Sequence, residues 1–395
     1  MAFVQSLDKL PGPVRDGPTW LLYGALGVLG YLLNGMGAVL GPLQRQLHVD
    51  RAAVAFYPSL FAIALLVVGL LGDRAAVRLG HRSVLRLALS GLVGGALLLT
   101  VPTRPATLVG ALVLGVGGAL IVQVVPAALN LRQRRAAAAA VAEANAISSF
   151  ASVLAPAAVA TAVAVGVGWQ VGYLLPVLPI AIVLVIAVRQ LVDGAGNGPA
   201  GSRQGGPGLE PGPLPGRWVD VLLAVSVEFC LVFWAADAFG EWHAAGPAAG
   251  PAMAALFLLG MALARTVAAR LTAGRHPLVV VVAACAAAGV GFTVFWAAPS
   301  TVVAAVGLFV TGLGVALLYP MTLARAVAAW PHATDRAAAR AALASGVAIG
   351  AAPLALARLA DHVGLRMAYL IVPILLGVLA AHAVSTLARP ERTPG

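Results

Sequence analysis

Long runs of apolar residues, separated by short charged segments, are the main pattern of this chain. A helix that crosses a membrane needs about 20 residues without charge, because it spans ~30 Å of hydrocarbon at ~1.5 Å per residue. Windows with room for one such helix are residues 17–44, 52–72, 87–103, 105–131, 242–264, 341–357 and 367–388. Each window predicts a single membrane-spanning helix.

Two other charge-free windows have room for two helices each. Residues 144–188 are interrupted at 166–169 and residues 276–324 are interrupted at 297–300, by segments that favour turns. One more helix is predicted at 217–239. The pattern therefore predicts twelve membrane-spanning helices and an all-α membrane protein.

Composition agrees with this pattern. The chain of 395 residues is 61% hydrophobic and 10% charged, with a mean hydropathy of +0.96, whereas soluble domains carry about 25% charged residues. The formal net charge of +11 comes from short clusters between apolar runs, which offer no folded face for nucleic acid. We therefore exclude a soluble protein and a nucleic-acid partner, and we interpret the charge as a determinant of membrane topology.

Motifs of catalysis and metal binding do not occur in the sequence. Cys230 and Cys285 lie inside apolar runs without metal-ligand spacing, and we expect both to be small core residues. No HExxH, GxSxG or Walker pattern is present. We therefore expect neither an enzyme nor a bound cofactor or metal.

The segment 69–82, with the sequence GLLGDRAAVRLGHR, joins two apolar windows and gathers basic residues. Since Lys and Arg are retained on the cytoplasmic side during insertion, this segment predicts a cytoplasmic loop. Its order of residues resembles the loop between the second and third helices of the major facilitator superfamily of secondary transporters. The positions that carry the resemblance, which implies a cytoplasmic gate, are Gly69, Asp73, Arg74, Arg78, Gly80 and Arg82.

The resemblance implies two pseudo-symmetric bundles of six helices. We expect them at residues 1–190 and 217–395, joined at 191–216 by a flexible cytoplasmic linker whose Gly and Pro content disfavours regular structure. Internal matches support a parallel duplication, because they follow the same order at a nearly constant separation. The matches pair Gly69 with Gly260, Arg78 with Arg270, Pro126 with Pro320, Arg132 with Arg325, Pro156 with Pro353, and Tyr173 with Tyr369.

In the family, the acid at the position of Asp73 lies against the N-terminus of helix eleven, which we expect here to begin near Thr334. A carboxylate at that place is stabilised by the helix dipole. The resemblance thus implies that Asp73 helps to close the cytoplasmic side.

The distribution of basic residues predicts the orientation of the chain. Most of the 25 Lys and Arg residues fall in segments that share one side of the membrane if the N-terminus is cytoplasmic. We therefore expect a multi-pass protein of the cell membrane, surrounded by the lipid bilayer, with both termini in the cytoplasm.

Glu228 is the strongest candidate for proton coupling. It lies near the middle of the predicted helix at 217–239, where insertion of a charged carboxylate costs ~2.5–3.5 kcal/mol. A buried carboxylate that binds and releases a proton as water access alternates would supply the chemistry of a proton-coupled transporter. The alternative is a hydrogen-bonded glutamate that only ties helices together.

Asp237 and Glu143 are further proton-coupling candidates. Asp237 shares a helix face with Glu241 near the outer end, so these acids form either an outer gate or proton access route, or a pair of solvated groups. Glu143 either pairs with arginines of the cytoplasmic loops as part of a gate or forms a plain surface ion pair.

Polar residues inside the predicted spans are few, and they are candidates for a substrate cavity. Asn145, Ser149, Ser152 and Pro156 form one stripe of a helix, which we expect to face a cavity or another helix and not lipid. The cavity candidates are Asn34, Gln123, Asn145, Ser149, Trp234 and Tyr319. So few hydrogen-bonding groups suit an apolar or amphipathic solute better than a sugar.

Together these features predict a proton-coupled secondary transporter of the major facilitator type. We expect a monomer that binds protons and a small-molecule substrate, an amphipathic organic compound, which it exports by alternating access. The alternative among transporters is a symporter that takes up a small nutrient. The alternative from another class is a non-transporting membrane sensor or scaffold, although the sequence contains no soluble signalling domain.

Overall fold

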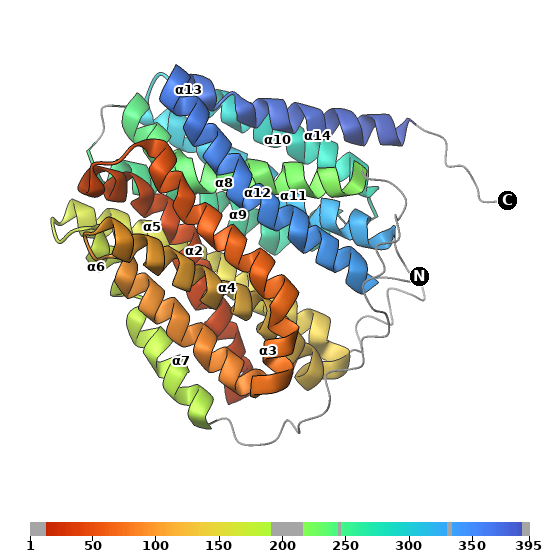
Figure 1. The fold of residues 1–395 in the computed structure, drawn as a ribbon. Coiled ribbons are helices and arrows are strands. Elements are labelled where there is room, and N and C mark those ends of the chain that lie inside the picture. Colours follow the sequence, from red (N-terminus) through yellow and green to blue (C-terminus); the bar gives the residue numbers. More distant parts are fainter. Residues whose placement is uncertain (1–12, 191–215, 244–245, 273, 330–333, 389–395) are drawn as a thin grey trace. The chain divides into compact units, whose positions relative to one another are not determined.

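The computed structural model describes residues 13–190, 216–243, 246–272, 274–329 and 334–388 (Figure 1). Within these ranges every regular element is a helix, as the apolar windows predict. Up to residue 190 the helices are α2 (Gly17–Leu47), α3 (Arg51–Leu99), α4 (Arg104–Gln133), η2 (Arg134–Ala136), α5 (Ala137–Ala164), α6 (Trp169–Leu174) and α7 (Leu178–Gln190). From residue 216 they are α8 (Gly216–Trp242), α9 (Ala249–Thr272), α10 (Pro277–Trp296), α11 (Thr301–Ala328), α12 (Thr334–Val363), α13 (Leu365–Ala368) and α14 (Ile371–Leu387).

Across the described ranges, 12 helical segments are long and apolar enough to cross a membrane, which confirms the predicted number. The predicted interruptions are also present, because α5 and α6 are separated at 165–168 and α10 and α11 at 297–300. In the first of these turns Gly166 and Gly168 have φ angles of 79° and 89°. Glycine adopts this left-handed conformation without steric cost, so the turn is encoded locally.

The helix α3 differs from the expected pair of helices joined by a long loop. It is interrupted only at Gly80, whose φ of 76° and ψ of 151° are not helical. Its two candidate spans are Arg51–Gly69 and Arg82–Leu99. The segment predicted as a loop is therefore helical up to Gly80, because the Ala, Leu and Arg residues that it contains are strong helix formers.

The helix α9 is longer than the charge-free window 242–264 indicates. It continues to Thr272, and its candidate span, Ala249–Ala268, includes Arg265. A count of uncharged residues ends this helix too early, because a charged side chain can remain inside a span where it finds a partner.

The described residues pack into two compact units. The first comprises the described parts of Met1–Leu33, Ala64–Ser152 and Leu174–Gly212, and the second those of Asn34–Ile63, Val153–Tyr173 and Pro213–Gly395. Within the second unit, α8 packs against α9, α11, α12 and α14, and α10 packs against α11 and α14 (Figure 1). The helix α8 is thus the element that most of the second unit surrounds.

Glycines bring two pairs of helices into backbone contact. A Cβ atom on Gly95 of α3 would lie 2.4 Å from the nitrogen of Leu114 in α4. A Cβ atom on Gly307 of α11 would lie 2.4 Å from the nitrogen of Phe295 in α10. These distances leave no room for a side chain, so the close approach of each helix pair requires glycine.

Glycines with positive φ recur at matching places in the two halves of the sequence. Gly80 and Gly274, with φ of 76° and 67°, each precede the third helix of their half. Gly168 and Gly364, with φ of 89° and 81°, each precede the sixth helix, which begins with α6 or α13. This recurrence supports a duplicated six-helix bundle, and the division at residues 191–216 stays a prediction.

Replacement of Gly95 by alanine is expected to destabilise the protein by about 1–3 kcal/mol, since the added Cβ would collide with the backbone of α4. Gly94→Ala is the matched control, because nothing lies within 4 Å of a Cβ atom at Gly94. Thermal unfolding of the two purified variants in detergent measures the difference. Equal melting temperatures would show that stability does not depend on the contact between α3 and α4.

Candidate functional site

Glu228 forms an ion pair inside the second unit. Its Oε1 atom accepts a hydrogen bond of 3.0 Å from Nη2 of Arg265 in α9, and only 13% of the Glu228 side chain is exposed. The pairing compensates a charge that would otherwise be costly within a span. The sequence did not indicate this partner, because Arg265 was expected beyond the end of its helix.

Tyr319 of α11 lies close to this pair. Its hydroxyl interacts with Ser345 of α12 and, electrostatically, with both Glu228 and Arg265. The three helices α8, α9 and α11 are in mutual contact, which brings these side chains together. A predicted cavity residue and a predicted coupling residue therefore lie at the same place in the second unit.

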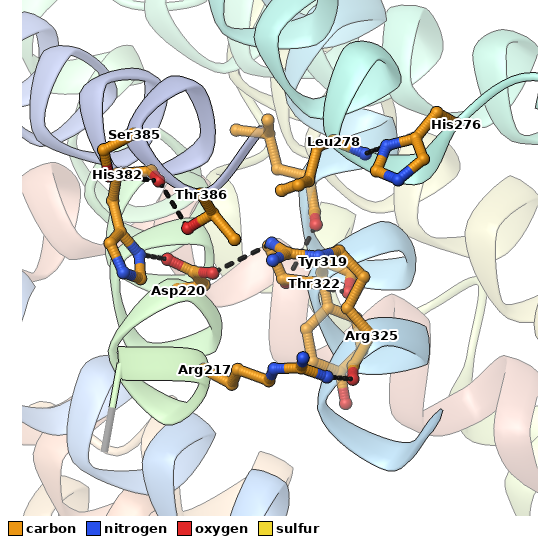
Figure 2. A network of polar contacts seen from close by, with 11 residues as sticks. Arg217, Asp220, His276, Leu278, Tyr319, Thr322, Arg325, His382, Ser385 and Thr386 are labelled. Atoms are coloured by element: carbon orange, nitrogen blue, oxygen red, sulfur yellow. Dashed lines mark hydrogen bonds and ion pairs between the residues drawn. The ribbon is translucent and has the colours of Figure 1, made fainter. Parts of the chain in front are cut away.

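A second group of charges lies near the start of α8 (Figure 2). Asp220 has 2% of its side chain exposed, and its Oδ2 atom lies 3.0 Å from Nη1 of Arg325 in α11. Its Oδ1 atom lies 2.5 Å from Nδ1 of His382 in α14. Arg217 donates a hydrogen bond of 3.1 Å to the carbonyl oxygen of Arg325. These contacts tie α8, α11 and α14 together at one end.

The first unit contains a related ion pair. Arg132, near the end of α4, binds Asp16 through Nη2 and through Nε, the latter at 3.3 Å. Asp16 also accepts hydrogen bonds from the backbone nitrogen of Thr19 at 3.1 Å and from its hydroxyl at 2.8 Å. Asp16 therefore caps α2 as well as joining it to α4.

Hydrogen bonds set the protonation of Asp16. The bond from Arg132 lowers the pKa of Asp16 from 3.8 to about 2, with help from Thr19 and against the effect of partial burial. Because the pKa is depressed in the folded protein, the stabilisation is present above pH 3.8 and is lost as the pH falls towards 2. The pair is thus fully charged at neutral pH.

The two ion pairs occupy matching places. In each half, an acid at the start of the first helix, Asp16 or Asp220, binds an arginine near the end of the fourth, Arg132 or Arg325. The sequence comparison matched the arginines but did not single out Asp220. Asp220 could have been identified from the sequence, because an acid lies near the start of each half and the arginines that these acids bind occupy matching positions.

Glu143 lies in a contact of its own within the first unit. Arg15 donates to it from Nη2 at 2.7 Å and from Nε at 3.2 Å, and the hydroxyl of Tyr23 donates at 3.0 Å. Arg15 is exposed, so this pair resembles a surface ion pair, which typically contributes ~0–1 kcal/mol. These contacts favour the plain ion pair over a gate.

Asp237 and Glu241 lie one helical turn apart on α8 and both approach Arg51, the first residue of α3. Nη2 of Arg51 donates to Oε2 of Glu241 at 2.7 Å, and its Nε lies 3.5 Å from Oδ2 of Asp237. A cavity of about 720 Å³ adjoins the three side chains. The sequence pattern did not single out Arg51, although the two acids predicted near the outer end of their helix could have indicated that they bind an arginine there.

The remaining cavity candidates have different surroundings. Trp234 is fully buried and donates from Nε1 to the carbonyl oxygen of Pro353 at 3.1 Å, which joins α8 to α12. Asn145 is exposed and donates to the carbonyl oxygen of Val141 in its own helix at 2.9 Å. The half-buried candidates are Asn34, Gln123 and Ser149. Their role in substrate binding stays a prediction.

The structure describes only some residues of the cytoplasmic gate motif that the family resemblance implies. Gly80 forms the interruption of α3. The exposed or half-buried members of the motif are Gly69, Arg78 and Arg82. The side chains of Asp73 and Arg74 lie outside the described residues. The helix that the resemblance assigns to Asp73 as its partner, α12, begins at Thr334 as expected.

Among the residues that the structure describes, no group of three or more His, Cys, Asp or Glu side chains is arranged to hold a metal ion. Cys230 and Cys285 are free and buried, as expected of core residues.

Comparison with known proteins identifies relatives at the level of family and fold. The sequence profile described as Major Facilitator Superfamily matches residues 22–243. No curated protein sequence matches the chain.

Among solved structures, the chain is similar to a D-xylose-proton symporter, with a TM-score of 0.73 and 14% identity over 92% of this chain and 96% of that one. It is similar to the inward open xylose transporter XylE from E. coli, with a TM-score of 0.72 and 13% identity over 95% and 97% of the two chains. For the nucleoside transporter NupG the TM-score is 0.75, with 13% identity over 93% and 99%. At such low identity the likeness concerns the fold.

The two acid–arginine pairs are expected to differ in their importance for stability. Asp220→Asn leaves the charge of Arg325 without a partner at 11% side-chain exposure, which costs about 3–5 kcal/mol of stability for a buried pair. Asp16→Asn is the matched control, because its pair is partly exposed and asparagine still caps the helix, so the loss is about 1 kcal/mol or less. Thermal unfolding of both variants provides the measurement. A drop in melting temperature as large for Asp16→Asn as for Asp220→Asn would contradict this ranking.

Proposed function

Because the chain belongs to the major facilitator superfamily, we propose that it is a proton-coupled secondary transporter that works by alternating access. The observation that carries the proposal is the pair of Glu228 and Arg265, a carboxylate and a guanidinium that face each other between two candidate spans. An ionisable pair at such depth is costly and is typically retained for ion or substrate movement.

Proton binding at Glu228 would change the charge balance between α8 and α9. A proton taken up by the carboxylate neutralises it, and the guanidinium of Arg265, 3.0 Å away, then lacks a counter-charge. An uncompensated charge favours a rearrangement that supplies water, substrate or another partner to Arg265. Tyr319 is a predicted cavity residue that already interacts with both groups. Release of the proton on the opposite side would restore the pair.

The other two carboxylates have weaker support as coupling groups. Glu143 is held by Arg15 and Tyr23, and Arg15 is exposed. Asp237 is held by Arg51 near the end of α8, far along the helix from Glu228. We therefore assign coupling to Glu228 first and keep Asp237 and Glu143 as secondary candidates.

Export of a small amphipathic organic compound is the direction and substrate class that we propose. The support for the substrate class is the small number of hydrogen-bonding side chains in the spans, which suits such a solute better than a sugar. A single chain carries both predicted bundles, at 1–190 and 217–395, so a monomer suffices for a transport path. The bias of basic residues supports a place in the cell membrane with both termini cytoplasmic.

Proton symport of a small nutrient is the second candidate. The observation that favours it is the similarity of the fold to a D-xylose-proton symporter and to the nucleoside transporter NupG. Both candidates use the same coupling pair and differ in the direction of substrate movement relative to protons.

Glu228→Gln is expected to abolish proton-driven transport, because glutamine cannot bind and release a proton. The measurement uses proteoliposomes with a trapped pH-sensitive dye, an imposed proton gradient, and a panel of sugars, nucleosides and amphipathic cations. Substrate movement along with the protons indicates symport, and movement against them indicates export. We expect no coupled flux above that of liposomes without protein.

The double variant Glu228→Gln with Arg265→Gln is the control for folding. It removes both charges, so no unpaired guanidinium remains, and we expect it to insert and to bind substrate without moving protons. Coupled flux at the unaltered rate in either variant would remove Glu228 from the mechanism.

A further inference from the structure

One arginine of the second unit is held between two tryptophan rings. Arg366 lies in the short helix α13, and its Cζ atom is 5.1 Å from the centre of the Trp296 ring and 5.9 Å from that of the Trp242 ring. Both distances suit a cation–π interaction, which extends to about 6 Å. We call Trp242, Trp296 and Arg366 the arginine–tryptophan cluster.

Hydrogen bonds and ring contacts fix the position of this guanidinium. Nη2 of Arg366 donates to the carbonyl oxygen of Trp296 at 3.1 Å, and Nε1 of Trp296 donates to the carbonyl oxygen of Arg366 at 2.9 Å. Trp242 in turn packs against Phe295 and Tyr369, with ring centres 5.1 Å and 5.6 Å apart. The planar guanidinium is therefore oriented before any ligand binds, which favours recognition of an oxyanion.

The hydrogen-bond partner of Arg366 does not neutralise its charge. Among the described residues this partner is a carbonyl oxygen, whereas Arg51, Arg265 and Arg325 each bind an acid of α8. A guanidinium carries five N–H donors, so the bond to Trp296 leaves donors for a ligand. The side chain of Arg366 is also exposed, and an anion can therefore reach it.

The cluster lies at the ends of three candidate spans. Trp242 and Trp296 are the last residues of their spans, and Arg366 is the second residue of the span Leu365–Leu387. Span ends lie at the level of the lipid headgroups, where tryptophan is enriched. The exposed guanidinium is thus expected at the depth of the phosphate groups of the bilayer.

An exposed apolar surface lies deeper in two of these spans. It is formed by Val290 and Val294 of α10 and by Ile374 and Val378 of α14, and these two helices pack against each other. All four residues lie further from the span ends than Trp296 and Arg366 do. An exposed apolar surface of this kind marks a membrane contact. It suits the acyl chains of a lipid, whereas a free phosphate ion has no apolar part to contact it.

From this arrangement we propose that the arginine–tryptophan cluster binds the phosphate group of a phospholipid whose acyl chains lie along the exposed surface of α10 and α14. The guanidinium can donate two parallel hydrogen bonds to two phosphate oxygens, and basic sites between membrane helices recognise lipid headgroups in this way. In the orientation that the basic residues predict, the lipid belongs to the outer leaflet. The site does not depend on the proposed transport cycle, because it requires neither a proton nor a solute.

Native mass spectrometry of the purified, delipidated protein in detergent tests this site. The protein is titrated with dioleoyl phosphatidylglycerol, and the apparent dissociation constant of the first bound lipid is measured. Arg366→Gln removes the charge-assisted hydrogen bonds to phosphate and is expected to raise this constant about tenfold or more. Arg358→Gln is the matched control, because it removes an exposed arginine of α12, and the constant should stay unchanged.

A second variant separates the stacked geometry from the charge. Arg366→Lys keeps a positive charge but loses the planar fork, so we expect a dissociation constant between those of the unaltered protein and Arg366→Gln. Two comparison ligands separate the sources of the interaction. Inorganic phosphate lacks acyl chains and dioleoylglycerol lacks a phosphate, and neither should displace phosphatidylglycerol when added at the same concentration.

Three outcomes would overturn the lipid site. One is binding by Arg366→Gln as tight as by the unaltered protein, when thermal unfolding shows the variant to be folded. Another is displacement of phosphatidylglycerol by dioleoylglycerol or by inorganic phosphate, since acyl chains alone or a free-ion site would then explain the binding. The third is unchanged affinity in Arg366→Lys, which would show that the stacked guanidinium has no role. The comparison ligands use the unaltered protein, so they decide the matter even if Arg366→Gln does not fold.

Discussion

A charge inside hydrocarbon needs a partner, and this requirement determines how the helices face one another. Backbone groups are satisfied within each helix, but a charged side chain must reach a neighbouring helix. Each ion pair therefore fixes the rotation of two helices about their axes. Four acids of α8 form ion pairs with neighbouring helices: Asp220 with α11, Glu228 with α9, and Asp237 and Glu241 with α3. The helix α8 is consequently held near its start, in its middle and near its end by different neighbours.

Both halves of the sequence contain an ion pair between the first and fourth helices, but the two pairs differ in burial. Asp16 and Arg132 meet in a partly exposed site, whereas Asp220 and Arg325 are buried and are joined by His382. The joining of the first and fourth helices in both halves supports the predicted duplication. The second half depends more on its ion pair than the first, because an unpaired charge is more costly where water is excluded.

The number of membrane-spanning helices could be predicted because the cost of crossing hydrocarbon acts locally along the chain, whereas the limits of α3 and α9 could not. The turns at 165–168 and 297–300 were visible for the same reason. Charge partners could not be predicted, since they depend on where a helix ends and which way it faces. Arg265 appeared to lie beyond its helix, and Asp220 looked like an ordinary residue of a helix start. Glu228 was recognisable by its depth alone, but its pairing was not.

The glycine contacts of α3 with α4, and of α10 with α11, have a consequence for measuring motion. Where backbone atoms meet at Gly95 and at Gly307, no flexible side chain lies between the helices to absorb sliding. We therefore expect Arg82–Leu99 of α3 to move with α4, and α10 to move with α11, while deformation is taken up at contacts that side chains mediate. Spectroscopic probes attached within one of these pairs would therefore provide a fixed internal reference for its own unit, against which displacement of the other helices of that unit can be measured.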